Sequence, residues 1–289
     1  MIFGGIEAGG TKWVCAIGSG LGPGPLRDTV VIPTTTPDET IGRAAEFLAR
    51  DDGLSAVGVG SFGPIDRRAG RITTTPKAGW AGVDLVDRLR ARLDLPVVLD
   101  TDVNAAALGE HRWGAAVGLD TFCYITVGTG IGGGGMANGR LIHGLLHPEL
   151  GHMRVPHDRE RDPFDGVCPY HRDCLEGLAS GRAMRARWGR PAEGIDDEEA
   201  WLLEADYLAL GLVNVICVLS PRRIVVGGGV LRQPALLPLV RRRVRELAGG
   251  YLAAAELGEG IDEYIVPPAL GDRAGVLGAI ELAREAVAS

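Results

Sequence analysis

The chain has 289 residues, 46% of them hydrophobic and 23% charged, which excludes wholesale disorder and allows two domains. A formal net charge of −7 argues against a nucleic-acid partner. No apolar run approaches the ~18 residues of a membrane span, and the start MIFGGIEAGG lacks the basic region of a signal peptide. Five cysteines, an odd number, favour a reducing compartment, so we expect a cytoplasmic protein without a membrane partner.

Glycine and lysine usage are both unusual. Glycine accounts for 44 residues and is clustered, which indicates tight turns and close approach of the backbone to a ligand. Of the 30 basic residues only Lys12 and Lys77 are lysines. A coding bias towards arginine explains the overall ratio, because most surface sites tolerate either residue. The bias draws attention to the two lysines that remain.

The first half of the chain alternates strands and helices. Residues 2–17 are predicted to form two strands joined by a Gly-Gly turn, followed by a third strand over 28–33. A helix is expected over 37–50, since Thr36 can cap it and apolar residues recur at helical spacing. The elements expected after it are a strand over 54–62, a helix over 83–93, a strand over 96–100 and a helix over 104–114.

The second half begins in the same way, with a strand, a glycine turn and a strand over 121–140. A polar insertion follows at 148–174. The later elements expected are helices at about 177–190 and 197–219, a strand over 222–230, a helix over 235–248, a strand over 263–267 and a last helix over 273–288. This order predicts two similar α/β domains with mixed sheets, joined by a hinge near 115–120. Cys15, Cys123 and Cys217 lie in apolar patterns and are expected in the core.

Three glycine segments could each hold phosphate. The first segment runs from Glu7 to Lys12. Its backbone amides and the hydroxyl of Thr11 could bind a phosphate, and Glu7 could bind a metal ion or its water. The alternative is a plain hairpin turn. The second, 128–134, has G-x-G-x-x-G spacing but leads into a strand, so a Rossmann fingerprint is rejected. The third, 227–229, follows a strand and precedes a helix, which suits a nucleotide at the strand ends.

Asp100, Asp102 and Asn104 follow an apolar strand, where carboxylates of α/β sheets commonly act in catalysis. Asp102 could take the proton from an attacking hydroxyl, and Asn104 could orient that substrate. The alternative is an Asx turn that caps the following helix.

The strongest spacing signal is Cys-x-x-His-x-x-Cys, from Cys168 through His171 to Cys174. With His152 or His157 these residues would complete a tetrahedral zinc site, whereas a disulfide or a chance cluster are the alternatives. Two carboxylates and an imidazole beside this knuckle could bind vicinal sugar hydroxyls, or be solvated loop residues. These three residues are Glu149, His152 and Glu176.

Together these motifs resemble the ROK family of sugar kinases and repressors. The motifs that occur in the order and at the spacing of the family are GGTK, DTDVNAAALGE, ITVGTGIGGG, ELGH, the Cys/His knuckle, CLEGLASG and VVGGGV. GIEAGGTK, ITTTPKAGW and the knuckle look like its fructokinase branch, and His171 stands where most members have cysteine. The resemblance implies two ribonuclease-H-like domains of the actin-like ATPase fold with an active-site cleft between them. The N-terminal domain would span 1–118, with the last helix, 273–289, packed back on it, and the C-terminal domain 119–272, with the zinc knuckle at 148–176.

The resemblance also implies a role for each motif residue. Asp102 would be the catalytic base, and Glu7 would help to hold Mg²⁺, through water. The residues implied for ATP are Gly9, Gly10, Thr11, Lys12, Thr129, Gly130, Gly227, Gly228 and Gly229. Those implied for the sugar are Asn104, Glu149, His152 and Glu176. The Zn²⁺ ligands would be His152, Cys168, His171 and Cys174.

The reaction implied is transfer of the γ-phosphoryl group of ATP to D-fructose, giving fructose 6-phosphate. The alternatives are a kinase for mannose, glucose or an N-acetylhexosamine, or a sugar-binding protein without turnover. A repressor would need an N-terminal helix-turn-helix, for which the residues before Ile2 leave no room. A homodimer is implied by the resemblance as well.

Overall fold

The computed structural model describes residues 1–24 and 26–288, in two compact units. Unit 1 comprises Met1–Gly118, Leu141–Pro148 and Pro268–Ser289, and unit 2 comprises Leu119–Arg140 and Glu149–Pro267. Ser289, the last residue expected in the C-terminal helix segment, lies outside the described residues.

The division differs from the one expected from the sequence, which kept 119–272 in one domain. Leu141 instead packs against the apolar cluster of Ala105, Leu108 and Leu282 in unit 1. The backbone amides of Ala269 and Leu270 donate to the buried carboxylate of Glu110, also in unit 1, at 3.1 and 2.9 Å. These local interactions draw both segments into unit 1.

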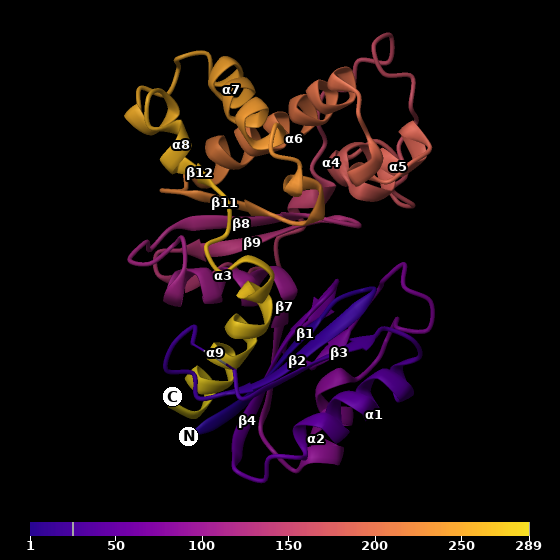
Figure 1. Ribbon diagram of the computed structural model, residues 1–289, viewed down its shortest axis with the longest axis vertical. Coiled ribbons are helices and arrows are strands. Elements are labelled where there is room, and N and C mark those ends of the chain that lie inside the picture. Colours follow the sequence, from indigo (N-terminus) through magenta and orange to yellow (C-terminus); the bar gives the residue numbers. More distant parts are fainter. Residues whose placement is uncertain (25, 289) are drawn as a thin grey trace. The chain divides into compact units, whose positions relative to one another are not determined.

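Unit 1 contains a five-stranded mixed sheet in the order β3-β2-β1-β4-β7 (Figure 1). The predicted Gly-Gly hairpin is confirmed, since β1 and β2 pair antiparallel from Phe3–Gly18 to Ala8–Trp13. The strands β4 and β7 then add in parallel. The strands of this unit are β1 (Ile2–Ala8), β2 (Lys12–Gly18), β3 (Asp28–Pro33), β4 (Leu54–Ser61), the two-residue β5 (Ile65–Asp66) and β6 (Arg71–Ile72), and β7 (Val97–Thr101).

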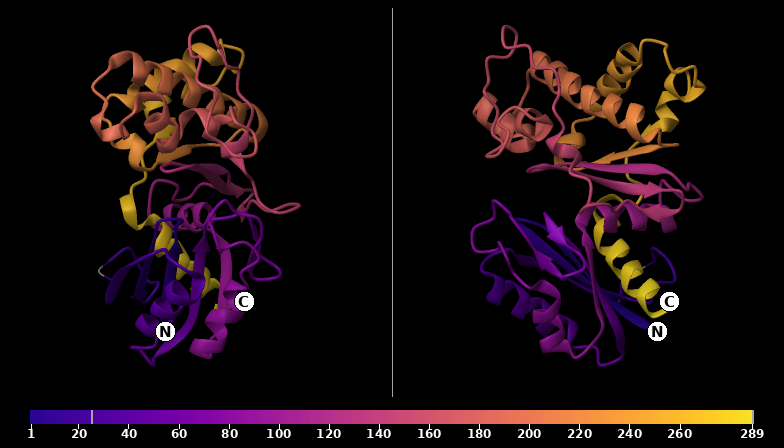
Figure 2. Two further views of the ribbon diagram at one scale, coloured as in Figure 1. Left: turned by 90° about the vertical axis from the view of Figure 1, so that its right-hand side faces the viewer. Right: turned by 180° about the vertical axis from the view of Figure 1, so that it is seen from behind.

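Helices cover both faces of this sheet because its side chains alternate in direction. Gly4 faces Leu48 of α1 (Pro37–Leu48), whereas its neighbour Gly5 faces Ile280 of α9 (Ala274–Ala288). On the α1 side, α2 (Leu85–Leu93) shares the same core. On the α9 side, α3 (Asp102–Trp113) packs against α9, which is the yellow helix of unit 1 in Figure 2.

The α9 layer is packed at backbone distance. A Cβ atom at Gly58 of β4 would lie 1.9 Å from the carbonyl oxygen of Ala279, and one at Gly278 would lie 1.6 Å from that of Ala105 in α3. No side chain fits at either position, so glycine is required there for steric reasons.

Unit 2 repeats the topology, with a sheet in the order β10-β9-β8-β11-β12. The second glycine hairpin is confirmed as antiparallel, and β11 and β12 add to β8 in parallel. Its strands are β8 (Phe122–Val127), β9 (Ile131–Ala137), β10 (Arg140–Leu141), β11 (Ile224–Gly227) and β12 (Ile265–Val266). Its helices are α4 (Leu175–Ala179), α5 (Gly181–Trp188), α6 (Glu198–Leu219), α7 (Leu236–Ala248) and α8 (Ile261–Tyr264). The 3-10 helices are η1 (Leu150–His152), η2 (Ala192–Gly194), η3 (Gly229–Arg232), η4 (Ala255–Leu257) and, in unit 1, η5 (Gly271–Arg273).

Three sequence expectations in unit 2 were wrong. The helix expected at 177–190 is broken at Ser180, which ends α4 and caps α5 by accepting a hydrogen bond from the amide of Ala183. The strand expected over 263–267 is the end of α8 followed by two strand residues. Cys217 is exposed rather than in the core, because it lies with the exposed Val218 on the outer side of the last turns of α6.

By length and composition α6 could cross a membrane, the one such helix in the part of the chain that is described. It packs against α7 and α4, and residues along its length, from Ala200 to Ile216, belong to the core of unit 2. The contacts of α6 are those of a core helix.

The close packing of α9 predicts opposite effects for two Gly→Ala substitutions. Gly278→Ala forces Ala105 and α9 apart, so we expect the Tm to fall by about 5 °C or more, given ~1–3 kcal/mol for overpacking. Gly42→Ala, inside α1 with open space around it, should leave the Tm unchanged or raise it, because alanine favours the helix by about 0.5–1 kcal/mol. Thermal unfolding of both variants tests this, and an unchanged Tm for Gly278→Ala would contradict the packing described.

Candidate active site and metal centre

The turn of the first hairpin forms an open loop at the end of β1 and β2. The amide of Gly9 donates to the carbonyl of Lys12 at 3.0 Å, and a Cβ at Gly9 would lie 2.7 Å from that carbonyl oxygen. Gly10 has open space around it, and Thr11 and Lys12 are exposed. Behind the turn, Thr34 donates its hydroxyl to the Gly9 carbonyl at 2.7 Å and its amide to the Thr11 carbonyl at 2.9 Å. The turn is thereby braced from one side and open on the other, as a phosphate loop requires.

Asp102 lies in the first turn of α3, directly after β7. Thr101 caps the helix by accepting a hydrogen bond from the amide of Asn104 at 3.1 Å, and Asp102 Oδ1 accepts one from the amide of Val103 at 2.9 Å. Removal from water raises the pKa of Asp102 to about 6, since desolvation disfavours the charged carboxylate. A carboxyl with a pKa near neutral pH is suited to general-base catalysis.

Glu7, at the end of β1, is the electrostatic neighbour of Asp102. Burial and then the charge of Asp102 raise the pKa of Glu7 to about 7, whereas Lys12 acts to lower it. Its Oε2 atom is buried and has no hydrogen-bond partner among the described residues. Such an oxygen fits the role of a ligand to a cation or to the water bound by one. The charge of Asp272, just before α9, also raises the pKa of Glu7, and the sequence reasoning missed this residue.

Asn104 is fully buried and belongs to a network that the sequence reasoning missed. Its amide donates to Asp100 Oδ1 at 2.9 Å, and the second oxygen of Asp100 bonds to His143 Nε2 at 2.8 Å. His147 accepts a hydrogen bond from the amide of Ile65 at 3.0 Å. The two histidines therefore fasten the segment 141–148 to unit 1, and Asn104 helps to hold this arrangement. Its contact with a sugar stays a prediction.

In unit 2, the exposed Thr129 and the half-buried Gly130 form the turn between β8 and β9. Glu176 holds this turn, because its Oε2 accepts a hydrogen bond from the amide of Ile131 at 3.0 Å. A Cβ at Gly130 would lie 2.5 Å from the same oxygen. The other oxygen of Glu176 accepts from Arg182 at 3.1 Å. Glu176 thus positions the second glycine turn, and its contact with a sugar also stays a prediction.

The third glycine segment approaches the end of β8. Gly228 has φ +99°, and a Cβ there would lie 2.4 Å from the carbonyl oxygen of Val127. Gly229 begins η3 and has open space around it. The second and third glycine segments therefore lie together at the carboxyl ends of β8 and β11, where α/β sheets bind ligands.

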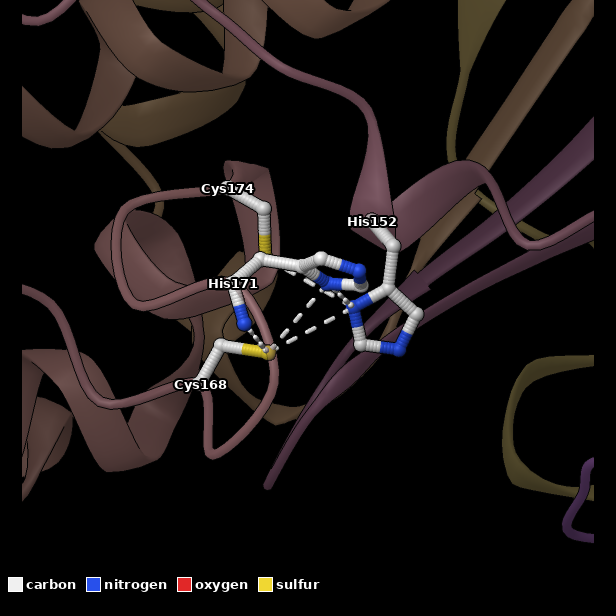
Figure 3. Close-up of side chains that lie close together, drawn as sticks. All are labelled: His152, Cys168, His171 and Cys174. Atoms are coloured by element: carbon white, nitrogen blue, oxygen red, sulfur yellow. Dashed lines mark hydrogen bonds between the residues drawn. The ribbon is translucent and has the colours of Figure 1, made fainter. Parts of the chain in front are cut away.

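His152, Cys168, His171 and Cys174 converge in unit 2, with their ligand atoms all within 4.8 Å of one another (Figure 3). His152 Nδ1 lies 3.3 Å from His171 Nδ1, 3.5 Å from Cys174 Sγ and 3.6 Å from Cys168 Sγ. A tetrahedron with Zn–N of ~2.0–2.1 Å and Zn–S of ~2.3 Å has edges of about 3.3 and 3.6 Å between such atoms. The four atoms therefore have the spacing of a zinc site. Burial raises the pKa of Cys174 to about 11, so a thiolate there needs a cation to stabilise it.

His152 rather than His157 is the fourth member of the cluster. It ends η1, where its amide donates to the carbonyl of the exposed Glu149 at 2.9 Å. His157 Nε2 instead lies 3.0 Å from the carbonyl oxygen of Asp162, whose carboxylate is bonded to Arg187 and Tyr207. This buried network anchors the insertion to α5 and α6 independently of the Cys/His cluster.

The ROK family profile matches residues 3–286. The chain belongs to the ROK family. It is 44% identical to a fructokinase of Zymomonas mobilis over 98% of this chain and 96% of the relative, and 40% identical to a fructokinase of Pediococcus pentosaceus over 99% of both. A glucokinase of Streptomyces coelicolor is 29% identical over 97% of both chains.

The fold agrees with this membership. The crystal structure of a ROK hexokinase from Thermus thermophilus matches with a TM-score of 0.80 at 30% identity, covering 100% of this chain and 99% of the hexokinase. The two mixed sheets are thus those of a ROK sugar kinase, with a Cys/His cluster in the second unit.

The ligand geometry predicts one zinc ion per chain. Cys174→Ser should lose the metal and loosen the insertion, because a buried hydroxyl is a poor replacement for a thiolate ligand. Cys217→Ser, at an exposed cysteine outside the cluster, is the matched control and should keep it. Elemental analysis of protein purified without chelators checks both, and wild-type protein without zinc would refute the assignment.

Proposed function

We propose that this ROK protein is an ATP-dependent fructokinase that transfers the γ-phosphoryl group to the 6-hydroxyl of D-fructose. The observation that carries the proposal is the full-length similarity to fructokinases at 44 and 40% identity, against 29% for the glucokinase. The presence of a half-buried Asp102 at the start of α3, directly after β7, supports it. A sugar-binding protein without turnover would not need such a group.

In the proposed mechanism Asp102 accepts the proton of the sugar hydroxyl as the new P–O bond forms. The hydrogen bond from the Val103 amide orients its carboxylate, and the raised pKa lets it take up this proton near neutral pH. The turn at Gly9–Lys12 offers backbone amides, a hydroxyl and an ammonium group to the phosphate chain. Positioning and charge stabilisation supply most of the catalysis in such a loose transition state.

The nucleotide would also contact the turn at Thr129 and Gly130 and the segment Gly227–Gly229. Both glycine segments lack side chains that would block a phosphate or a sugar ring, which favours this role. Mg²⁺, when bound with help from Glu7 through water, would neutralise part of the phosphate charge. The unpartnered Oε2 of Glu7 fits this role.

The proposed sugar contacts are Asn104, Glu149, His152 and Glu176. The zinc ion would be structural: held through Nδ1 of His152, it would fix the ring so that Nε2 can face a hydroxyl. In the same proposal the enzyme acts in the cytoplasm, where Cys168 and Cys174 stay reduced, and as a homodimer.

A panel of single sugars tests the reaction. With Mg-ATP we expect ADP release chiefly with fructose, and much less with mannose, glucose, N-acetylglucosamine or N-acetylmannosamine. Turnover chiefly with another hexose would keep the kinase and overturn the substrate. Absence of turnover with every sugar, in zinc-loaded folded protein, would favour a binding protein.

The role of Asp102 predicts a specific loss. Asp102→Asn should lower kcat by at least ~10²-fold without lowering the Tm, since it removes a proton acceptor but keeps the size of the side chain. In the wild type, kcat/KM should fall as the pH drops through 7 to 6, because Asp102 and Glu7 take up protons with pKa values of about 6 and 7. Steady-state kinetics from pH 5 to 9 measure both effects. Near-wild-type turnover of the variant would remove Asp102 from its role.

A further inference from the structure

Lys77 is one of only two lysines among 30 basic residues, and no step described so far uses it. Arginine is used at all the other basic positions of this chain, so the choice of lysine at a site stands out. A site that keeps lysine is therefore one where a compact ammonium group is preferred to a planar guanidinium. The other such site, Lys12, lies in the first phosphate turn.

The loop that carries Lys77 is firmly docked beside this turn in unit 1. Trp80, three residues on, is fully buried and its indole nitrogen donates to the carbonyl of Thr35 at 2.9 Å. Its ring packs against Trp13, the residue after Lys12, with 5.6 Å between the ring centroids, and against Phe62 at 5.5 Å. The loop position is thus fixed by apolar packing against β2 and does not depend on Lys77.

The ammonium group of Lys77 donates to the carbonyl of Thr34 at 3.3 Å. Thr34 is the residue that braces the turn through the carbonyls of Gly9 and Thr11. Thr34 is therefore hydrogen-bonded both to the Lys77 ammonium and to the backbone of the first glycine turn.

Lys77 makes no ion pair within the described part of the chain, and its side chain is half-buried. An ammonium group has three donors, and the carbonyl of Thr34 occupies one of them. A rigidly placed cation without a carboxylate partner, beside a loop of backbone amides, is suited to bind an anion.

We propose that Lys77, held beside the first turn by its hydrogen bond to the Thr34 carbonyl, binds the phosphate chain of the nucleotide as a second cation with Lys12. This inference rests on the proposed kinase function. Lysine suits the position because a single positive charge on a flexible stem can follow the phosphoryl group as it moves, whereas the fixed fork of arginine cannot.

The scarcity of lysine makes a direct test possible. Reductive ¹³C-methylation keeps the charge and labels only Lys12, Lys77 and the terminal amine, so each signal can be followed by NMR in the full-length protein. On saturation with Mg-AMPPNP we expect the methyl signal of Lys77 to change its chemical shift, because a bound phosphate changes the surroundings of the ammonium group. Fructose alone should leave this signal unchanged. A Lys77 signal that does not move with the nucleotide, or that moves with fructose alone, overturns the assignment.

Kinetics give the second test. Lys77→Met should lower kcat/KM for ATP by about 10²-fold, and Lys77→Arg should restore only part of it. Arg67→Met removes one positive charge from an exposed turn of the same unit and should stay within about twofold of wild type. Thermal unfolding should be similar for all three variants, since Trp80 docks the loop. Wild-type kcat/KM in Lys77→Met overturns the proposal.

The two proposals fail in different ways. If no sugar is phosphorylated by the wild type, the kinase function fails, while the NMR titration still tests Lys77 against the nucleotide.

Discussion

The architecture of unit 1 depends on the approach of α9 to within backbone contact of β4 and α3. Gly58 and Gly278 allow this approach, because a Cβ at either position would overlap a carbonyl oxygen. The first turn of α9 then reaches the end of β1, where a Cβ at Gly275 would lie 2.4 Å from Cδ of Glu7. The backbone amide of Val276 donates to the carboxylate of Glu7, which opposes the rise in its pKa caused by burial. A helix from the end of the sequence therefore shapes the electrostatics beside the first glycine turn.

Unit 2 contains a polar insertion that has little apolar core of its own. Two separate sets of interactions hold this insertion in place. The Cys/His cluster closes the loop that leads into α4, and the buried Asp162 ties the rest of the insertion to Arg187 and Tyr207. The helix α4 also carries Glu176, which accepts a hydrogen bond from the amide of Ile131 next to Thr129 and Gly130. A well-ordered insertion therefore also fixes the position of the second glycine turn. The Cys/His cluster is thus linked through α4 and Glu176 to the second glycine turn.

Local spacing predicted much of this, and long-range contacts account for what it missed. Cys168, His171 and Cys174 were found because three ligands within one loop must be neighbours, whereas the choice of His152 over His157 depends on η1 and on Asp162. The pair of Asp100 and His143 could not be found, since 43 residues separate them. Both glycine hairpins were predicted from the sequence because their paired strands are also neighbours along the chain.

Two further misses have physical causes. The helix α6 is apolar on nearly all sides, so periodicity could not identify the exposed face that carries Cys217. A sequence also does not distinguish Gly58, which admits no side chain, from Gly42, which has open space around it. That difference is created by the neighbouring helix and exists only in the fold.

The order of synthesis has a consequence for this fold. The strands of unit 1 leave the ribosome first, but the helix that covers one face of their sheet is made after the whole of unit 2. At ~5–20 residues per second, the interval between Gly118 and Ala274 is roughly 8 to 30 s. During that time the face bearing Phe3, Ala16 and Ala56 lacks its partners on α9. The nascent chain therefore presents an apolar, strand-rich surface until the last helix has been made.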